Sequence, residues 1–149
     1  MMATTFEIVE RVRERSFQLT DVSDFHLLES GRLPAEEILE NPHITLYSLD
    51  FENSRAVFVE TEPGVNLSQA PFYFVTQYEE AKRVLTISFE TMIKLAQSTA
   101  VDEKRLIFIH SVGRSGSTLA SQIFAQVPGV LNISEPDALT LVVVARNAN

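Results

Sequence analysis

Apolar positions recur at roughly helical spacing near the start of the chain, with charged residues between them. From Phe6 to Phe17 this spacing is that of one face of an amphipathic helix, which predicts a helix over Thr4–Arg15. A second helix is expected over Val22–Ser30, with Gly31 as its stop signal. The beginning of the chain is therefore predicted to be helical.

In the middle of the chain the pattern changes to short runs of β-branched and aromatic residues. Strands are predicted at Ile44–Leu49, Ala56–Glu60, Phe72–Val75 and Val84–Ile87. The tripeptide Glu52-Asn53-Ser54 between the first two runs indicates a hairpin. A short helix over Pro34–Leu39 precedes these strands, and a helix over Glu90–Gln97 follows them. Residues 1–103 are thus expected to form an N-terminal α+β region.

The last third of the chain reads as strand, loop and helix. Leu106–Ile109 is a continuous apolar run, as expected for a strand buried on both faces of a parallel sheet. A Gly- and Ser-rich loop over His110–Thr118 follows, and apolar residues then recur at helical spacing from Leu119 to Val127. This order directs backbone N–H groups and a helix N-terminus at one spot, which suits an anionic phosphate.

The loop has the length of the phosphate-binding pattern G-x-x-x-x-G-K-S/T but not all of its residues. With Gly116 aligned, Ser111 occupies the first glycine position, Ser117 the lysine position and Thr118 the hydroxyl position. The lysine that reaches the outer phosphates is therefore missing. Arg114 supplies positive charge from inside the loop, and its planar fork of donors suits phosphate or sulfate oxygens.

The loop sequence resembles the 5′-phosphosulfate-binding loop of the PAPS-dependent sulfotransferases, whose usual form is Pro-Lys/Arg-Ser-Gly-Ser/Thr-Ser/Thr. Its form here is most similar to the carbohydrate, tyrosylprotein and bacterial branches of that family. The resemblance implies PAPS (3′-phosphoadenosine 5′-phosphosulfate) as co-substrate, contacted by Arg114. It also implies that backbone and hydroxyl groups of the loop bind the phosphosulfate oxygens. The implied cofactor-binding residues are Gly113, Arg114, Ser115, Gly116, Ser117 and Thr118.

A second match lies at Ser134-Glu135-Pro136, where the glutamate follows Arg114 by 21 residues. In the tyrosylprotein branch a glutamate at similar spacing acts as the catalytic base. By this resemblance Glu135 is the candidate base that takes the proton of the acceptor hydroxyl, and Arg114 is the second candidate catalytic residue. The residues alone offer another interpretation, which is compatible with the first: Pro136 and Asp137 begin a helix, with the acid complementing the helix dipole.

Charge is distributed unevenly along the 149 residues, which carry a net charge of −8. Residues 1–105 hold 10 of the 12 basic and 18 of the 20 acidic side chains, so that residues 106–149 are neutral overall. A pI near 4.8 argues against a nucleic-acid surface, because phosphate neutralisation needs clustered Lys and Arg. A single small anion needs only one local site and is compatible with this composition.

Other function classes are excluded by what the sequence lacks. There is no cysteine, which excludes disulfides, thiolate metal sites and cysteine nucleophiles. No metal site is predicted. No apolar stretch approaches the ~18 residues of a membrane span, and no signal sequence is recognisable, so a cytoplasmic protein without a membrane partner is expected.

The expected fold class is α/β: the start of a P-loop-type parallel-sheet sulfotransferase domain at residues 104–149, preceded by the α+β region at residues 1–103. The second part is expected to be incomplete, as in an N-terminal fragment, and no residues for the 3′-phosphate are assigned. The function expected is transfer of a sulfuryl group from PAPS to a hydroxyl or amine of a small-molecule, carbohydrate or peptide acceptor, with the fragment itself inactive or incomplete. A divergent P-loop kinase or NTPase and a non-catalytic interaction module remain as alternatives.

Overall fold

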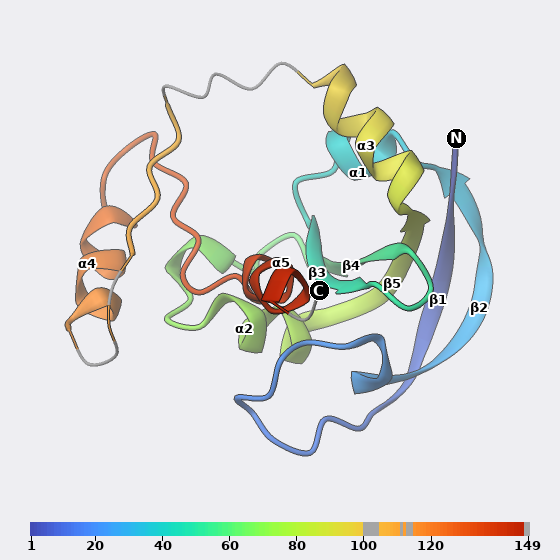
Figure 1. Ribbon diagram of the computed structural model, residues 1–149, viewed down its shortest axis with the longest axis horizontal. Coiled ribbons are helices and arrows are strands. Elements are labelled where there is room, and N and C mark those ends of the chain that lie inside the picture. Colours follow the sequence, from blue (N-terminus) through green and yellow to red (C-terminus); the bar gives the residue numbers. More distant parts are fainter. Residues whose placement is uncertain (100–104, 111, 113–114, 148–149) are drawn as a thin grey trace.

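The N-terminal two-thirds of the chain forms a curved antiparallel sheet (Figure 1). The computed structural model describes residues 1–99, 105–110, 112 and 115–147. Within these residues the sheet has five strands in the order β2-β1-β5-β4-β3, and each neighbouring pair is antiparallel. The strands are β1 (Met2–Arg11), β2 (Phe25–Pro34), β3 (Ile44–Asp50), β4 (Arg55–Thr61) and β5 (Ala81–Ser88).

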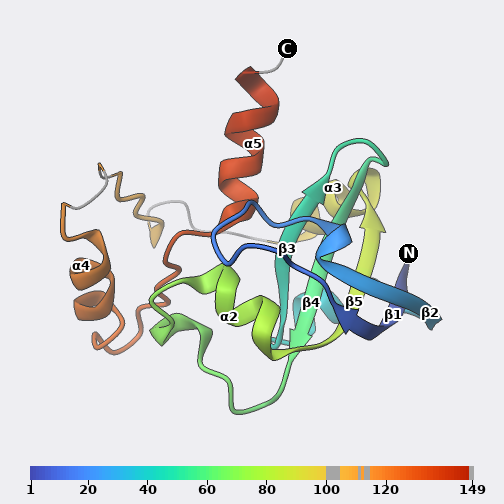
Figure 2. The same ribbon diagram turned by 90° about the horizontal axis from the view of Figure 1, so that it is seen from below.

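Helices cover both faces of this sheet, and two more lie in the C-terminal part. The α-helices are α1 (Glu37–Glu40), α2 (Tyr73–Glu80), α3 (Phe89–Ser98), α4 (Ser117–Phe124) and α5 (Asp137–Asn147). Two 3₁₀ helices are η1 (Val22–Asp24) and η2 (Leu67–Gln69). Helix α5 contacts β3 at the edge of the sheet, whereas Figure 2 shows α4 set further apart, on the same side as α2. No helix of the described residues is long and apolar enough to cross a membrane.

Strand β4 shows how the sequence builds the two-sided core. Its residues alternate between the faces: Ala56 and Phe58 pack with α1 and α3, whereas Val57 and Val59 pack on the opposite face with β2, β3 and α2. All four side chains are at most 7% exposed. A strand in the middle of a sheet covered on both faces is expected to be apolar at every position, as this one is.

The predicted helix over Thr4–Arg15 is wrong, because this segment is mostly strand β1. The register between β1 and β2 shifts between Ile8 and Glu10, which leaves Val9 without a partner and 68% exposed. Before the shift, Phe6 and Ile8 alternate as a strand requires and pack on one face of the sheet. Because the unpaired Val9 follows Phe6 by three residues, the apolar spacing resembled that of a helix.

The predicted helix over Val22–Ser30 is also wrong beyond its first turn. Only Val22–Asp24 is helical, and β2 begins at Phe25. Gly31 lies inside β2, where it pairs with Thr5, and does not end a helix. The short helix predicted at Pro34–Leu39 is present but shifted, at Glu37–Glu40.

Phe72–Val75 is not a strand but the start of α2. The buried side chains Tyr73, Phe74 and Gln77 recur at the spacing of one helix face. Packing of this face against the sheet overrides the strand preference of its aromatic residues. The strands predicted at Ile44–Leu49, Ala56–Glu60 and Val84–Ile87, the hairpin joining the first two, and the helix at Glu90–Gln97 are confirmed.

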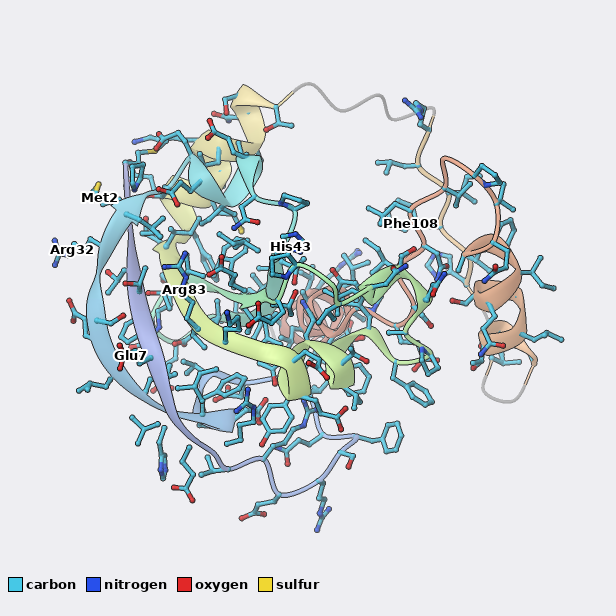
Figure 3. The ribbon with its side chains drawn as sticks, turned by 180° about the vertical axis from the view of Figure 1, so that it is seen from behind. Met2, Glu7, Arg32, His43, Arg83 and Phe108 are labelled. Atoms are coloured by element: carbon cyan, nitrogen blue, oxygen red, sulfur yellow. The ribbon has the colours of Figure 1, made fainter. Side chains whose placement is uncertain are left out.

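The buried parallel strand predicted at Leu106–Ile109 is wrong. These residues belong to no strand and are 53–81% exposed. Figure 3 shows Phe108 on a segment that lies away from Arg83 on β5 and from His43, the residue just before β3. A strand needs a neighbour with free backbone groups, and this run lies beside neither edge of the sheet, β2 or β3 (Figure 1). The described chain is therefore a mixed α and β fold on an antiparallel sheet, and the expected parallel sheet is not part of it.

Candidate functional site

The described end of the Gly-rich loop, from Ser115, leads directly into α4. Gly113 and Arg114 lie outside the described residues. Ser115 donates its backbone N–H to the carbonyl of Val112 at 3.3 Å. Gly116 follows with φ +85°, and a Cβ there would meet nothing within 4 Å. Glycine is therefore favoured at this position by backbone conformation and not by lack of space.

A helix follows the loop, as the sequence predicted, but α4 begins at Ser117, two residues before the predicted start of the helical spacing at Leu119. Its first intrahelical bond runs from the N–H of Ala120 to the carbonyl of Gly116 at 3.1 Å. The N–H groups of Ser117, Thr118 and Leu119 have no intrahelical acceptor, and no side chain among the described residues caps the helix. The first turn thus combines free N–H groups, two hydroxyl side chains and the positive end of a helix dipole.

Glu135 occupies a turn just before α5. Its backbone has φ +53°, in the left-handed region that residues other than glycine rarely adopt, and its side chain is exposed. Such backbone strain is characteristic of functional sites. The carbonyl of Pro136 accepts the N–H of Leu139 at 3.0 Å, so the helix start predicted at Pro136 and Asp137 is confirmed.

The residues just before Glu135 are bound to the N-terminal part of the chain. The carbonyl of Ser134 accepts the N–H of Tyr73 at 3.1 Å, and its hydroxyl donates to the carbonyl of Pro71 at 3.0 Å. The amide of Asn132 donates to the carbonyl of Ser68 at 3.1 Å and to the hydroxyl of Ser121, on α4, at 2.7 Å. Asn132 thus connects α4, η2 and the segment that carries Glu135.

Asp137, two residues after Glu135, is bound in the same way. Its carboxylate accepts the backbone N–H of Thr20 at 3.0 Å. Burial raises the pKa of Asp137, and the nearby Asp24 and Glu135 carboxylates add to this rise. The Thr20 N–H and the Arg13 guanidinium act in the opposite direction and favour the charged form.

A buried polar cluster that the sequence did not reveal lies next to Thr20. The hydroxyl of Tyr47 donates to the carboxylate of Asp24 at 2.5 Å, and the Arg13 guanidinium lies 3.7 Å from the same carboxylate. The side chains of Arg13 and Asp24 are only 2% and 1% exposed. Burial, followed by the hydrogen bond to Asp24, raises the pKa of Tyr47. The three residues are far apart in sequence and come from segments predicted as helices or as an ordinary strand, so only the tertiary fold brings them together.

The predicted site has two parts, the loop at residues 113–118 and Glu135, and the structure brings them only partly together. Ser115, Gly116, Ser117 and Thr118 lie together at the start of α4. No hydrogen bond or ion pair among the described residues joins Glu135 to them, and Figures 1 and 2 show the N-terminal end of α4 well separated from the start of α5. The connection between the two is indirect, through Asn132 and Ser121.

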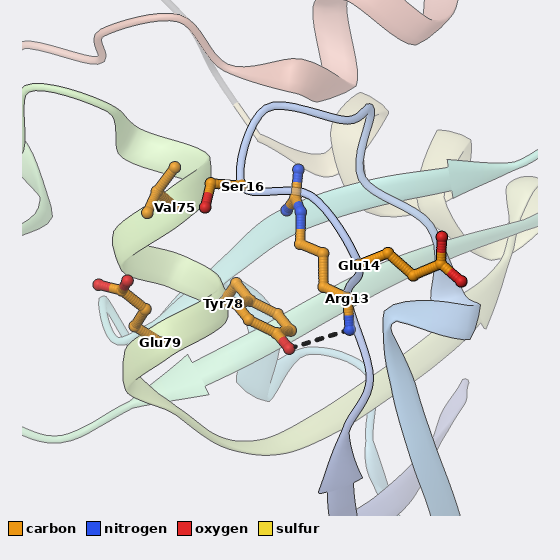
Figure 4. Close-up of a pocket in the computed structure, with 6 residues that line it drawn as sticks. All are labelled: Arg13, Glu14, Ser16, Val75, Tyr78 and Glu79. Carbon is orange, nitrogen blue, oxygen red and sulfur yellow. Dashed lines mark hydrogen bonds between the residues drawn. The ribbon is translucent and has the colours of Figure 1, made fainter.

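Two hollows in the N-terminal region contain none of the predicted site residues. The one in Figure 4, of about 80 Å³, lies between α2 and the segment after β1, where the Tyr78 hydroxyl accepts the N–H of Arg13 at 3.1 Å. It is far smaller than the roughly 300–1,000 Å³ of a typical ligand pocket. The other, of about 510 Å³, is lined by the ion pairs Glu60–Arg83 and Glu62–Lys82. Within the described residues, no group of three His, Asp or Glu side chains is arranged to hold a metal ion.

Comparison of the chain with models of known protein families, with curated proteins and with solved structures found no match.

Proposed function

We propose that the loop at residues 113–118 binds the phosphosulfate of PAPS and that the protein acts in sulfuryl transfer to a hydroxyl or amine acceptor. The observation that carries the proposal is the conformation of the loop's end. Gly116 is left-handed and Ser117 and Thr118 form the first turn of α4, within a Gly-Arg-Ser-Gly-Ser-Thr sequence. The proposal rests on this loop–helix unit and not on the sheet around it.

The chemistry requires binding of an anion and removal of one proton. The free N–H groups and hydroxyls of Ser117 and Thr118 provide donors for the phosphosulfate oxygens, and Arg114 neutralises their charge. The acceptor oxygen or nitrogen attacks sulfur, and the bond from sulfur to the 5′-phosphate oxygen breaks. The electron pair leaves with 3′,5′-adenosine bisphosphate, and Glu135 takes the acceptor proton.

The separation of Glu135 from the loop has a consequence for this chemistry. A base acts only within hydrogen-bond reach of the proton that it removes. Since no contact joins Glu135 to Ser115–Thr118 in the described structure, the reaction requires α4 and its loop to approach Glu135 when co-substrate binds. The acceptor, whether a small molecule, a carbohydrate or a peptide, then binds between them.

Titration of the ¹⁵N-labelled protein with 3′,5′-adenosine bisphosphate and, separately, with Mg-ATP tests the proposal. The bisphosphate is expected to shift the amide signals of Gly116, Ser117 and Thr118, because their N–H groups become hydrogen-bonded. Shifts with Mg-ATP alone would replace the proposal with a divergent kinase or NTPase. If neither nucleotide shifts these signals, the loop is not a nucleotide site and an interaction module is the better description.

A pair of arginine variants makes the test specific. Arg114→Ala is expected to weaken bisphosphate binding at least tenfold, since it removes the cation of the loop. Arg146→Ala, in the last turn of α5, removes the same charge away from the loop and is expected to leave binding unchanged. Equal binding by the Arg114→Ala variant and the parent protein would show that the loop assignment is wrong.

A further inference from the structure

Glu135 is held on both sides by contacts to distant parts of the chain. On the N-terminal side, Ser134 is 7% exposed and makes two hydrogen bonds to the segment that leads into α2, through Tyr73 and Pro71. On the C-terminal side, the carboxylate of Asp137 accepts the N–H of Thr20. Glu135 itself is exposed and makes none of these contacts. The turn is therefore fixed at its two ends, and the side chain between them is free to meet another molecule.

The left-handed backbone of Glu135 needs such support. A strained conformation persists only where the surrounding structure determines it. Gly116 relieves its own left-handed conformation by lacking a Cβ, whereas Glu135 has no such relief. The contacts of Ser134 and Asp137 fix the backbone immediately before and after Glu135. They therefore hold Glu135 in its left-handed conformation.

The groups that hold the turn are themselves rigidly placed. Thr20 is 1% exposed, its hydroxyl donates to the carbonyl of Tyr47 at 2.9 Å, and its carbonyl accepts the hydroxyl of Ser48 at 2.7 Å. Both partners belong to β3. The buried cluster of Arg13, Asp24 and Tyr47 fixes the same segment against the sheet. Through Thr20, the position of the Asp137 carboxylate is therefore fixed relative to the sheet.

We infer that Ser134 and Asp137 are positioning residues for Glu135, and that residues 1–99 serve as the scaffold that holds this carboxylate in its strained, exposed turn. The inference rests on the proposed function for what Glu135 does. It gives the N-terminal region a role that its sequence did not suggest. It also explains why an exposed glutamate retains a conformation that its own backbone disfavours.

Three variants of the full chain test the inference. Asp137→Ala removes the acceptor of the Thr20 N–H, and Asp137→Asn keeps an oxygen at that place. Thr140→Ala changes an exposed residue one turn further along α5 and is the matched control. Amide hydrogen exchange of Thr20 reports the contact, and the ³J(HN–Hα) coupling and Cα shift of Glu135 report its left-handed backbone.

For Asp137→Ala we expect at least tenfold faster exchange of the Thr20 amide and a shift of the Glu135 signals toward a mixture of conformations. Asp137→Asn is expected to restore both to within about threefold of the parent, and Thr140→Ala to change neither. If the Glu135 backbone signals stay unchanged in Asp137→Ala, the inference is overturned. Should that variant fail to fold, Ser134→Ala, which removes only the bond to Pro71, provides the same readout with a smaller expected shift.

Turnover separates this inference from the proposed function. In conversion of PAPS to the bisphosphate, with water as acceptor, Asp137→Ala is expected to lower kcat at least tenfold and to leave KM for PAPS within threefold. A parent protein that neither binds the bisphosphate nor turns over PAPS refutes the proposed function and the catalytic part of this inference. The backbone signals of Glu135 then still decide whether Ser134 and Asp137 hold the turn.

Discussion

Replacement of Glu135 by glycine separates the strain of its turn from the chemistry of its side chain. At φ +53° a residue with a Cβ is disfavoured by roughly 1–2 kcal/mol relative to ordinary right-handed backbone. Glycine avoids that cost but loses about 0.5–1 kcal/mol through the greater freedom of its unfolded chain. The balance predicts that Glu135→Gly stabilises the docked turn by about 0.5–1 kcal/mol relative to Glu135→Ala.

The assay is native-state hydrogen exchange of the Tyr73 amide, which donates to the carbonyl of Ser134 and so reports the opening of this turn. Exchange in Glu135→Gly is expected to be about two- to fivefold slower than in Glu135→Ala. Both variants lack the carboxylate, so both are expected to lose PAPS turnover. On the proposed function, the glycine variant is therefore expected to be as inactive as the alanine variant although its turn is more stable.

The same pair of substitutions at Thr140 provides the control. Thr140 lies within α5 and is exposed, so glycine there is expected to be less stable than alanine by about 1 kcal/mol. The sign of the glycine effect thus reverses between two positions five residues apart. If Glu135→Gly is no more stable than Glu135→Ala, the turn is not strained and the reasoning is refuted.

Three further predictions concern groups that hold the sheet and the turn. Burial raises the pKa of Asp137, so the native state binds its proton more tightly than the unfolded chain does. Docking of the turn should therefore weaken as the pH rises from about 3.8 through the raised pKa. Hydrogen exchange of the Thr20 amide should report this pH dependence in the parent protein and none in Asp137→Asn. Burial opposes ionisation of Asp50, but hydrogen bonds from the hairpin turn and from Arg55 outweigh this effect and lower the pKa of Asp50. The contribution of the Asp50 carboxylate to stability is therefore present above about pH 3.8 and is lost as the pH falls through the lowered pKa. Asp50→Asn should reduce the free energy of unfolding by about 1–2 kcal/mol at pH 7 and weaken the dependence of this free energy on pH in the acid range. An unchanged urea midpoint would contradict this prediction. Tyr47→Phe leaves the buried Asp24 carboxylate without its hydroxyl donor and should cost about 1–3 kcal/mol in urea unfolding, whereas an effect below 0.5 kcal/mol would show that the bond is dispensable.

Elements whose pattern is local were predictable from the sequence. The hairpin of β3 and β4 carries its strand runs and its turn within less than twenty residues, and the α3 helix has Ser88 as its N-cap, accepting the N–H of Thr91 at 3.1 Å. Strand β1 was predicted as a helix because the unpaired Val9 at its register shift disturbs the alternation of a strand. A register shift thus changes the period of the apolar residues, which is the signal from which a strand is predicted.

The candidate site divides in the same way. The loop at Ser115–Thr118 was recognisable because its motif and the helical spacing after it are carried by adjacent residues. The contact between Thr20 and Asp137 was not, since it joins residues 117 positions apart. The sequence identified Asp137 only as a first-turn acid, which it is, but gave no sign of the amide that it accepts from the N-terminal region.

The central place of β5 has a consequence for the order in which the chain assembles. The β1–β2 and β3–β4 hairpins are each formed by consecutive strands, but their strands join into one sheet through β5, which pairs with β1 on one side and β4 on the other. During synthesis both hairpins emerge from the ribosome before the strand that unites them, and the edges that β5 will cover stay exposed until Ser88 has emerged. Closure of the sheet is thus a late, non-local step, and topology of this kind favours slow folding. In the cell, the newly made chain therefore contains two separate hairpins until β5 has been synthesised and pairs with both.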